Sequence, residues 1–136
     1  MRKLLTGVCN NIVQNIDKIK LWENSFKKVS DGDVVLIAYN PTPDDIKTLE
    51  ESGIMYLNIS EHSSETVNNT RLTILSDFFR HHAKHYDIAL STDVFDVAFT
   101  RDPFKKLDLE KYDILKNIKE KFNMEYLMEN YLEYHL

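Results

Sequence analysis

Four short apolar runs, separated by segments with helical spacing, limit the folds open to this chain more than any other feature. The runs are KLLTGVC, DVVLIAY, IMYLNI and YDIAL, at residues 3–9, 33–39, 54–59 and 86–90. Each run is continuously apolar rather than alternating, which is typical of strands that are covered on both faces. Because such strands alternate with helices along the chain, the sequence predicts an α/β fold: a mostly parallel sheet with helices on both faces.

The segments between the runs carry their own helix signals. Residues 12–29 place apolar side chains at helical spacing, which predicts a helix that lays one face on the sheet. In NPTPDD, Thr42 is a suitable N-cap and Pro43 fits the first helical position, while Gly53 suits the end of that helix. A third helix is expected at about residues 69–85.

Length and composition favour one globular unit. A chain of 136 residues is most simply a single domain, and 43% hydrophobic with 29% charged residues excludes a disordered or fibrous class. We predict an α/β domain at residues 1–113 and a helical tail at 114–136 that packs on it. The formal net charge of −5 argues against nucleic acid as a partner, because nonspecific binding to nucleic acid needs a basic surface.

The cysteine count and the hydropathy pattern bear on location. Cys9 is the only cysteine, so the chain can form no internal disulfide and no cysteine-based zinc cluster. Polar residues interrupt the N-terminal apolar run too early for a signal peptide. No stretch reaches the roughly 18 to 20 apolar residues that span a bilayer. We therefore expect a soluble, cytoplasmic protein with no membrane span.

The segment STDVFDVAFTRDPF, at residues 91–104, brings carboxylates to the end of the fourth predicted strand. Ligands of open α/β sheets bind outside the carboxyl ends of the strands, where Asp93 and Asp96 are expected. Two neighbouring carboxylates raise each other's pKa unless a positive charge lies between them, and a divalent cation supplies that charge. The alternative is that Asp93 caps a turn and Asp96 is merely exposed. Asp102 is expected to cap the Asp-Pro-Phe turn.

The same segment carries a family resemblance. YDIALSTDVFDVAFTRDPF resembles the metal-binding segment of GT-A-fold nucleotide-diphosphosugar glycosyltransferases, in which an apolar strand leads to an Asp-x-x-Asp variant of the DXD motif and then to a DPF step. The resemblance covers about residues 3–113 and is most specific at 86–104. It implies a Rossmann-like GT-A sandwich, a nucleotide-diphosphate sugar as donor, and Mn²⁺ or Mg²⁺ as cofactor.

The resemblance also implies roles for individual residues. Those implied in binding the nucleotide sugar are Thr6, Gly7, Val8, Tyr39, Arg71 and Asp93. Asp93 and Asp96 would hold the metal on the diphosphate, and the turn at residues 6–8 would line the nucleotide. Tyr39 would stack on the base, unless it is an ordinary aromatic at a strand end. Arg71 would clamp phosphate with its planar guanidinium, unless it is a surface residue near a helix N-terminus.

The expected function is transfer of the sugar to an unknown acceptor, with retention or inversion left open. Residues 105–136 are helical in propensity and do not match the acceptor-binding half of that fold, so the chain resembles its nucleotide-binding half with a truncated or substituted ending. The alternative is a catalytically inactive GT-A-like remnant that acts as a binding or interaction module. Aromatic residues in the tail also suggest a homo-oligomer.

A second metal hypothesis comes from RHHAKH, where His81 and His85 have the i, i+4 spacing of a helical zinc site. The alternative is that these histidines favour the negative end of the helix dipole.

Overall fold

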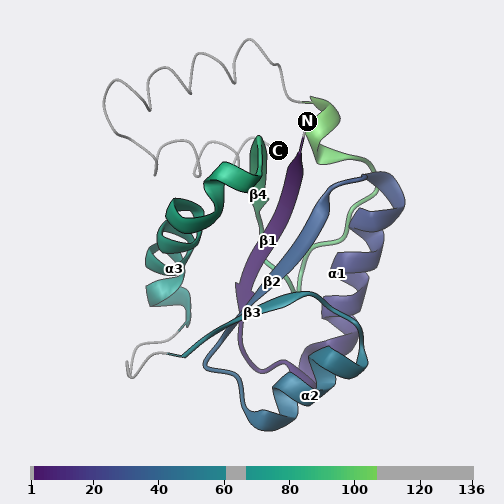
Figure 1. The fold of residues 1–136 in the computed structure, drawn as a ribbon. Helices are drawn as coiled ribbons and strands as arrows, with labels where there is room; N and C mark the ends of the chain where they lie inside the picture. The colour runs from purple at the N-terminus through teal and green to yellow at the C-terminus, as the bar shows by residue number, and fades with distance from the viewer. Residues whose placement is uncertain (1, 61–66, 107–136) are drawn as a thin grey trace.

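The computed structural model describes residues 2–60 and 67–106, which form an α/β fold around one parallel sheet (Figure 1). The elements are, in chain order, β1 (Lys3–Cys9), η1 (Val13–Asn15), α1 (Ile16–Val29), β2 (Asp33–Tyr39), α2 (Pro43–Glu51), β3 (Tyr56–Ile59), α3 (Val67–His82), η2 (Ala83–His85), β4 (Ile88–Ser91) and η3 (Pro103–Lys106). The four strands of this part of the chain lie in the order β3-β2-β1-β4, and every neighbouring pair is parallel.

The predicted elements agree with the structure in kind, and β1 and β2 agree in bounds as well. β3 begins at Tyr56 rather than at residue 54, because Ile54 closes the turn after α2 by donating its N–H to Leu49 O at 3.2 Å. β4 begins at Ile88, two residues later than expected, and ends at Ser91. The predicted tail at 114–136, with residues 107–113 of the predicted domain, lies outside the described residues.

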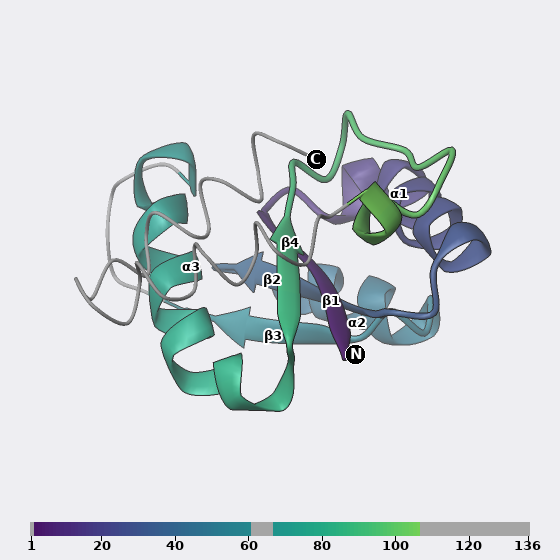
Figure 2. The same cartoon turned by 90° about the horizontal axis from the view of Figure 1, so that it is seen from above.

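Helices cover both faces of the sheet (Figure 2). On one face, α1 buries Trp22 and Phe26 against strand residues such as Leu36 and Leu90. On the other face, the α3 side chains pack on the opposite set of strand residues. This second cluster contains Leu4, Val8, Ile37, Tyr39, Ile74, Leu75 and Phe78. Side chains of a strand alternate between faces, so β1 and β2 contribute to both layers. The pattern explains why their sequences are continuously apolar.

Asp45 fixes the start of α2 and ties it to the segment after β1. Its Oδ2 accepts from the Thr42 N–H at 3.0 Å, and the Asp45 N–H donates to Thr42 Oγ1 at 3.1 Å, so the two residues form a capping box. The other carboxylate oxygen accepts from the Val13 N–H at 3.0 Å. Burial raises the pKa of Asp45, but the hydrogen bonds from the Thr42 and Val13 N–H groups outweigh it, and the net pKa is lowered.

Candidate functional site

The strand order places a topological switch point between β1 and β4. From β1 the chain passes through α1 to β2 on one side, whereas α3 carries it across to β4 on the other side of β1. Loops diverge at such a point, and ligands of open α/β sheets bind there, outside the carboxyl ends of the strands. Ser91, the last residue of β4, pairs with Thr6, and β1 continues beyond it to Cys9. The loop after β4 therefore begins alongside the last part of β1.

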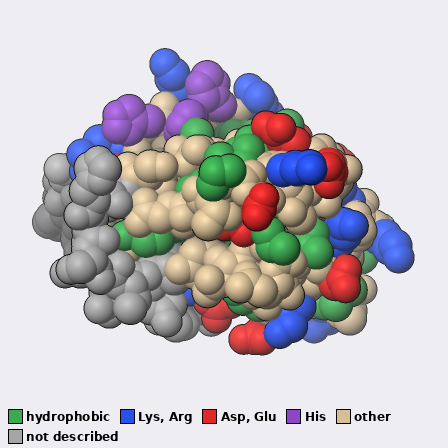
Figure 3. Space-filling view, turned by 90° about the horizontal axis from the view of Figure 1, so that it is seen from below, with side chains coloured by type: hydrophobic (Ala, Val, Ile, Leu, Met, Phe, Trp, Pro, Cys, Tyr) green, Lys and Arg blue, Asp and Glu red, His purple; other side chains and the backbone are tan. Residues whose placement is uncertain are grey.

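Asp93 and Arg71 meet at this edge of the sheet. Arg71 lies in the first half of α3, and its Nη1 contacts Asp93 Oδ1 in the loop after β4. The Asp93 side chain is 61% exposed and that of Arg71 is 25% exposed. The resemblance implies ligand binding by both residues, and the fold brings them into one ion pair. Figure 3 views the molecule from below the orientation of Figure 1, and acidic side chains lie near the middle of this face as well as toward its right and lower edges.

The backbone that carries Asp93 is held against β1. The Thr92 N–H donates to Thr6 O at 3.1 Å, and the Trp22 indole N–H donates to Thr92 Oγ1 at 2.9 Å. A Cβ at Gly7 would lie 2.5 Å from Val94 Cγ2 and 2.8 Å from Thr92 O, so the loop approaches β1 more closely than any side chain there allows. Val94 itself is buried. The residues on both sides of Asp93 are thus anchored, while its carboxylate remains exposed.

The three residues predicted to line the nucleotide contribute mainly to the interior of the sheet. Thr6 is fully buried, and its hydroxyl donates to Val35 O at 2.8 Å. Val8 is buried in the layer under α3, and Gly7 lies against the loop after β4. Any contact of this stretch with a ligand would therefore come at its carboxyl end, toward Asn10 and the loop that follows. The nucleotide-lining role stays a prediction.

Two asparagines at the same edge are not among the predicted site residues. Asn11 follows β1 with φ 53°, and Asn40 follows β2 with φ 46°. Positive φ is uncommon outside glycine but is tolerated by asparagine, and strained backbone of this kind clusters at ligand sites. Asn40 donates its N–H to Ile59 O at 2.7 Å, which fixes the ends of β2 and β3 relative to each other. The available signal was the asparagines that follow the apolar runs: Asn10 and Asn11 after β1, and Asn40 after β2.

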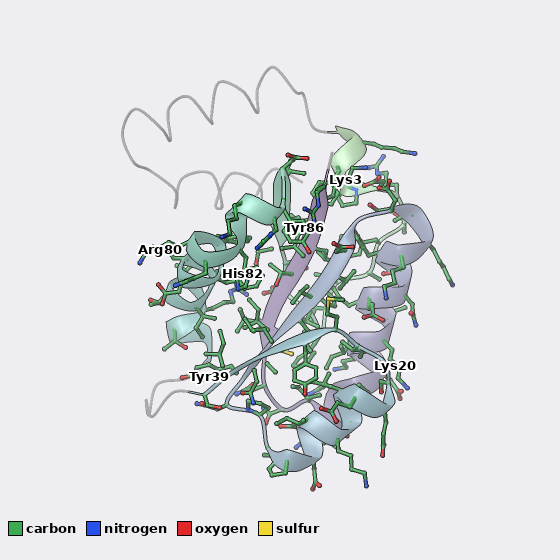
Figure 4. The ribbon with its side chains drawn as sticks, viewed as in Figure 1. Lys3, Lys20, Tyr39, Arg80, His82 and Tyr86 are labelled. Atoms are coloured by element: carbon green, nitrogen blue, oxygen red, sulfur yellow. The ribbon has the colours of Figure 1, made fainter. Side chains whose placement is uncertain are left out.

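Tyr39, the predicted base-stacking residue, is only 2% exposed. It packs with Ile74, Leu75 and Phe78 of α3, and Figure 4 shows it near the end at which that helix begins. Its hydroxyl has no hydrogen-bond partner among the described residues, although it is buried. The ring thus occupies the layer between sheet and helix, as an ordinary strand-end aromatic does, and stacking on a base stays a prediction.

The other two aspartates of the motif segment lie in different settings. Asp96 is exposed, in a turn that immediately follows the buried Val94. Asp102 is buried, and its Oδ1 accepts from the Phe104 N–H at 2.9 Å, which confirms that it caps the Asp-Pro-Phe turn. Asp102 Oδ2 also lies 3.9 Å from Lys3 Nζ, at the start of β1. Asp102 therefore belongs to the amino end of the sheet, away from the candidate site.

The exposed carboxylates of the loop after β4 are the candidate ligands for a divalent cation. The described residues contain no group of three or more His, Cys, Asp or Glu side chains that could hold a metal ion by themselves. Mg²⁺ and similar ions are, however, usually held by one or two carboxylates together with substrate phosphates. Asp93 and Asp96 are both exposed and lie three residues apart in the loop after β4, so they are the carboxylates that could take that part.

Cys9, at the end of β1, and the histidines of α3 and η2 are the remaining reactive side chains considered from the sequence. Burial, with a smaller contribution from the charge of Asp45, raises the pKa of Cys9 to about 12, so its thiol is a poor nucleophile near neutral pH. His85 lies in the η2 turn rather than in α3, so His81 and His85 do not share a continuous helical turn. His81 Nδ1 lies 2.7 Å from Asp77 O, and His82, which Figure 4 labels, stacks on Phe78. The zinc hypothesis stays a prediction without a third ligand among the described residues.

Comparison with known proteins assigns no family. The chain matches no protein-family model, and a search of the curated proteins finds no match. Among the described helices, none combines the length and the apolar character that crossing a membrane would require.

Proposed function

We propose that this chain binds a nucleotide-diphosphate sugar at the carboxyl ends of β1 and β4, through a divalent cation on Asp93 and Asp96, and transfers the sugar to an acceptor as a GT-A-type glycosyltransferase. The observation that carries the proposal is the meeting of Arg71 and Asp93 at the topological switch point. An exposed carboxylate beside a guanidinium offers both a cation ligand and a phosphate-binding group. The Asp-x-x-Asp pattern and the parallel sheet support it further.

Each residue has a distinct part in this proposal. Asp93 and Asp96 hold the cation, which when bound would neutralise charge on the leaving diphosphate. Arg71 binds and orients the phosphates through its planar fork. Thr92 and Gly7 fix the loop, so that the two carboxylates keep their positions when the ligand arrives. All of these roles concern binding of the sugar donor.

Thermal unfolding with a panel of nucleoside diphosphates and nucleotide sugars, with and without Mn²⁺, tests the proposal. A ligand present at about 100 times its dissociation constant stabilises the folded state by roughly 2.7 kcal/mol, which is readily seen as a rise in Tm. We expect a rise that requires Mn²⁺ and that is lost in the double variant Asp93→Asn/Asp96→Asn. No rise with any donor in the wild type would refute donor binding.

The matched control is Asp31→Asn. Asp31 is an exposed aspartate that pairs with Lys3 at 3.0 Å, at the opposite end of the sheet. This variant also removes one carboxylate from an exposed ion pair, so it should keep the Mn²⁺-dependent rise. If donors bind, release of the nucleoside diphosphate with Mn²⁺ present is measured next. Binding without any release would leave a donor-binding module and contradict the transferase part of the proposal.

A further inference from the structure

Three histidines lie together at the carboxyl end of α3 and in the turn that follows it. His81 and His82 belong to the last turn of α3, and His85 is the last residue of η2. Figure 3 shows the histidine side chains gathered at one edge of the view, with lysine and arginine side chains near them. Because η2 leads to the first residue of β4, Ile88, these histidines lie toward the opposite end of that strand from Asp93. The proposed donor site therefore makes no use of them.

The backbone brings His82, rather than His81, beside His85. The ring centroids of His82 and His85 are 6.3 Å apart, and the ring planes are tilted by 40°. η2 (Ala83–His85) is a 3-10 helix, in which side chains three positions apart lie one above the other. The i, i+4 pair expected from the sequence assumes an α-helical repeat, and that repeat ends at His82. His81 instead places its Nδ1 2.7 Å from Asp77 O.

The ring of His82 is held in place before any ligand arrives. It stacks on Phe78, with centroids 4.8 Å apart and planes at 30°. Phe78 is itself buried in the layer between α3 and the sheet. His85 is exposed at the end of η2, so its ring can turn toward His82. A pair with one fixed member loses less side-chain entropy on binding an ion than two unrestrained histidines would.

Two neighbouring imidazoles suit one class of metal ion. Imidazole nitrogen is a preferred ligand of Zn²⁺, Ni²⁺ and Cu²⁺, whereas Mg²⁺, Ca²⁺ and Mn²⁺ prefer oxygen. With metal–nitrogen distances of about 2.1 Å, the centres of two rings on one ion lie about 5–6 Å apart. The observed 6.3 Å therefore needs only a small rotation of His85.

The surroundings of the pair determine the rest of the coordination. Among the residues that the structure describes, no group of three His, Cys, Asp or Glu side chains is placed to hold an ion, so water would complete the coordination of an ion on the two imidazoles. Arg80 and Lys84, the neighbouring cations, are exposed, and water and salt screen their repulsion of the ion.

We propose that His82 and His85 form a two-histidine binding site for a transition-metal ion of the Zn²⁺, Ni²⁺ and Cu²⁺ class. The site is independent of the proposed function, because it uses neither Asp93 nor Asp96 and takes a different class of ion. An ion on both imidazoles joins the last turn of α3 to η2.

Isothermal titration calorimetry of the full chain with Zn²⁺ tests the site in the wild type, in His82→Gln and in His85→Gln. We expect each variant to lose affinity for Zn²⁺ by about tenfold or more, because the remaining imidazole no longer has a second ligand held beside it. Mn²⁺ prefers oxygen ligands, so it should bind the wild type and His85→Gln equally. Unchanged Zn²⁺ affinity in both variants, or a loss in only one of them, would refute the pair.

His81→Gln is the matched control, because it removes an exposed histidine from the position next to His82. It should keep the Zn²⁺ affinity of the wild type, and a loss as large as that of His82→Gln would contradict the assignment. His82→Gln also loses the stacking on Phe78, so its folding is checked by thermal unfolding without metal. Should it fold poorly, NMR of the wild type decides: Zn²⁺ should shift the ring resonances of His82 and His85 and leave those of His81 in place. Shifts confined to other histidines would overturn the proposal.

Discussion

Trp22 and Thr92 are 70 positions apart in the sequence, and the indole N–H of one donates to the hydroxyl of the other at 2.9 Å. The bond joins the middle of α1 to the residue directly before Asp93. Trp22 is fully buried and is the only tryptophan of the chain. The core under α1 is therefore linked directly to the loop that carries the candidate carboxylates.

Replacing Thr92 should show how much this link contributes. Thr92→Val keeps the size of the side chain but leaves the buried indole N–H without its acceptor, which typically lowers the free energy of unfolding by about 1–3 kcal/mol. Thr92→Ser keeps the hydroxyl and should lose less. Urea unfolding followed by Trp22 fluorescence measures both variants. Equal losses in the two would show that the hydroxyl is not what holds the loop.

Gly7 tests the close approach of the same loop to β1. Gly7→Ala would place its Cβ 2.5 Å from Val94 Cγ2 and 2.8 Å from Thr92 O, and the second neighbour is backbone. We expect a loss of about 1–3 kcal/mol in the free energy of unfolding, as is usual for overpacking. Adding Val94→Ala should restore only part of it, because the clash with Thr92 O remains. Chemical unfolding of the single and double variants measures this difference.

Gly53→Ala is a comparison variant, because its loss of stability should have a different physical cause from that of Gly7→Ala. Apart from its own chain neighbours, no atom of the described residues lies within 4 Å of a Cβ at Gly53, but the residue has φ +69°, so the cost of alanine is conformational, at about 1–2 kcal/mol. Only Gly7→Ala should also weaken Mn²⁺-dependent donor binding. Equal effects of both variants on donor binding would contradict the role given to the loop contact.

Asp45 should make the fold sensitive to acid. Its folded pKa is lowered, so the ionised form stabilises the fold at pH values above its unfolded pKa of about 4, and this contribution is lost as pH falls through the folded pKa. Asp45→Asn should be less stable than the wild type near pH 7, with a gap that narrows below about pH 4. Urea unfolding at a series of pH values measures the gap.

Asp44→Asn is the control for acid sensitivity. Asp44 is exposed in the first turn of α2, and its carboxylate does not form the capping box. It should change stability by only a few tenths of a kcal/mol, the contribution usual for an exposed charge at a helix N-terminus. A gap between wild type and Asp45→Asn that is the same at pH 7 and pH 3 would contradict the role of its ionisation.

The fold was predictable from the sequence because local signals agree with it. Continuous apolar runs indicate strands buried on both faces, and Thr42 and Pro43 mark the start of α2 as the structure has it. The strand bounds that differ between the prediction and the structure depend on tertiary contacts. Tyr86, predicted as the first residue of the fourth strand, precedes β4, and its hydroxyl donates to Asp33 Oδ2 at 2.9 Å, which the local sequence does not encode.

The candidate site was predictable only as a set of residue types. Asp93 could be named from its position after a strand and Arg71 only from the family resemblance, but their contact depends on how α3 lies over the sheet. The link between Trp22 and Thr92 has no local signal, since helical spacing explains the tryptophan as core alone. The burial of Tyr39 likewise follows from its neighbours in α3 rather than from its place at a strand end.

Replacing Tyr39 by phenylalanine should have the opposite effect on the free energy of unfolding from that of most Tyr→Phe substitutions at buried sites. Removing a tyrosine hydroxyl normally costs stability, because the group is hydrogen-bonded when buried. The hydroxyl of Tyr39 is buried and has no partner among the described residues, so Tyr39→Phe should leave the free energy of unfolding unchanged or raise it by about 1 kcal/mol. Tyr86→Phe is the matched control, because it removes a hydroxyl bonded to Asp33 at 2.9 Å and should lower stability. Urea unfolding of both variants measures the contrast, and a loss in Tyr39→Phe as large as that in Tyr86→Phe would show that the hydroxyl has a partner in solution.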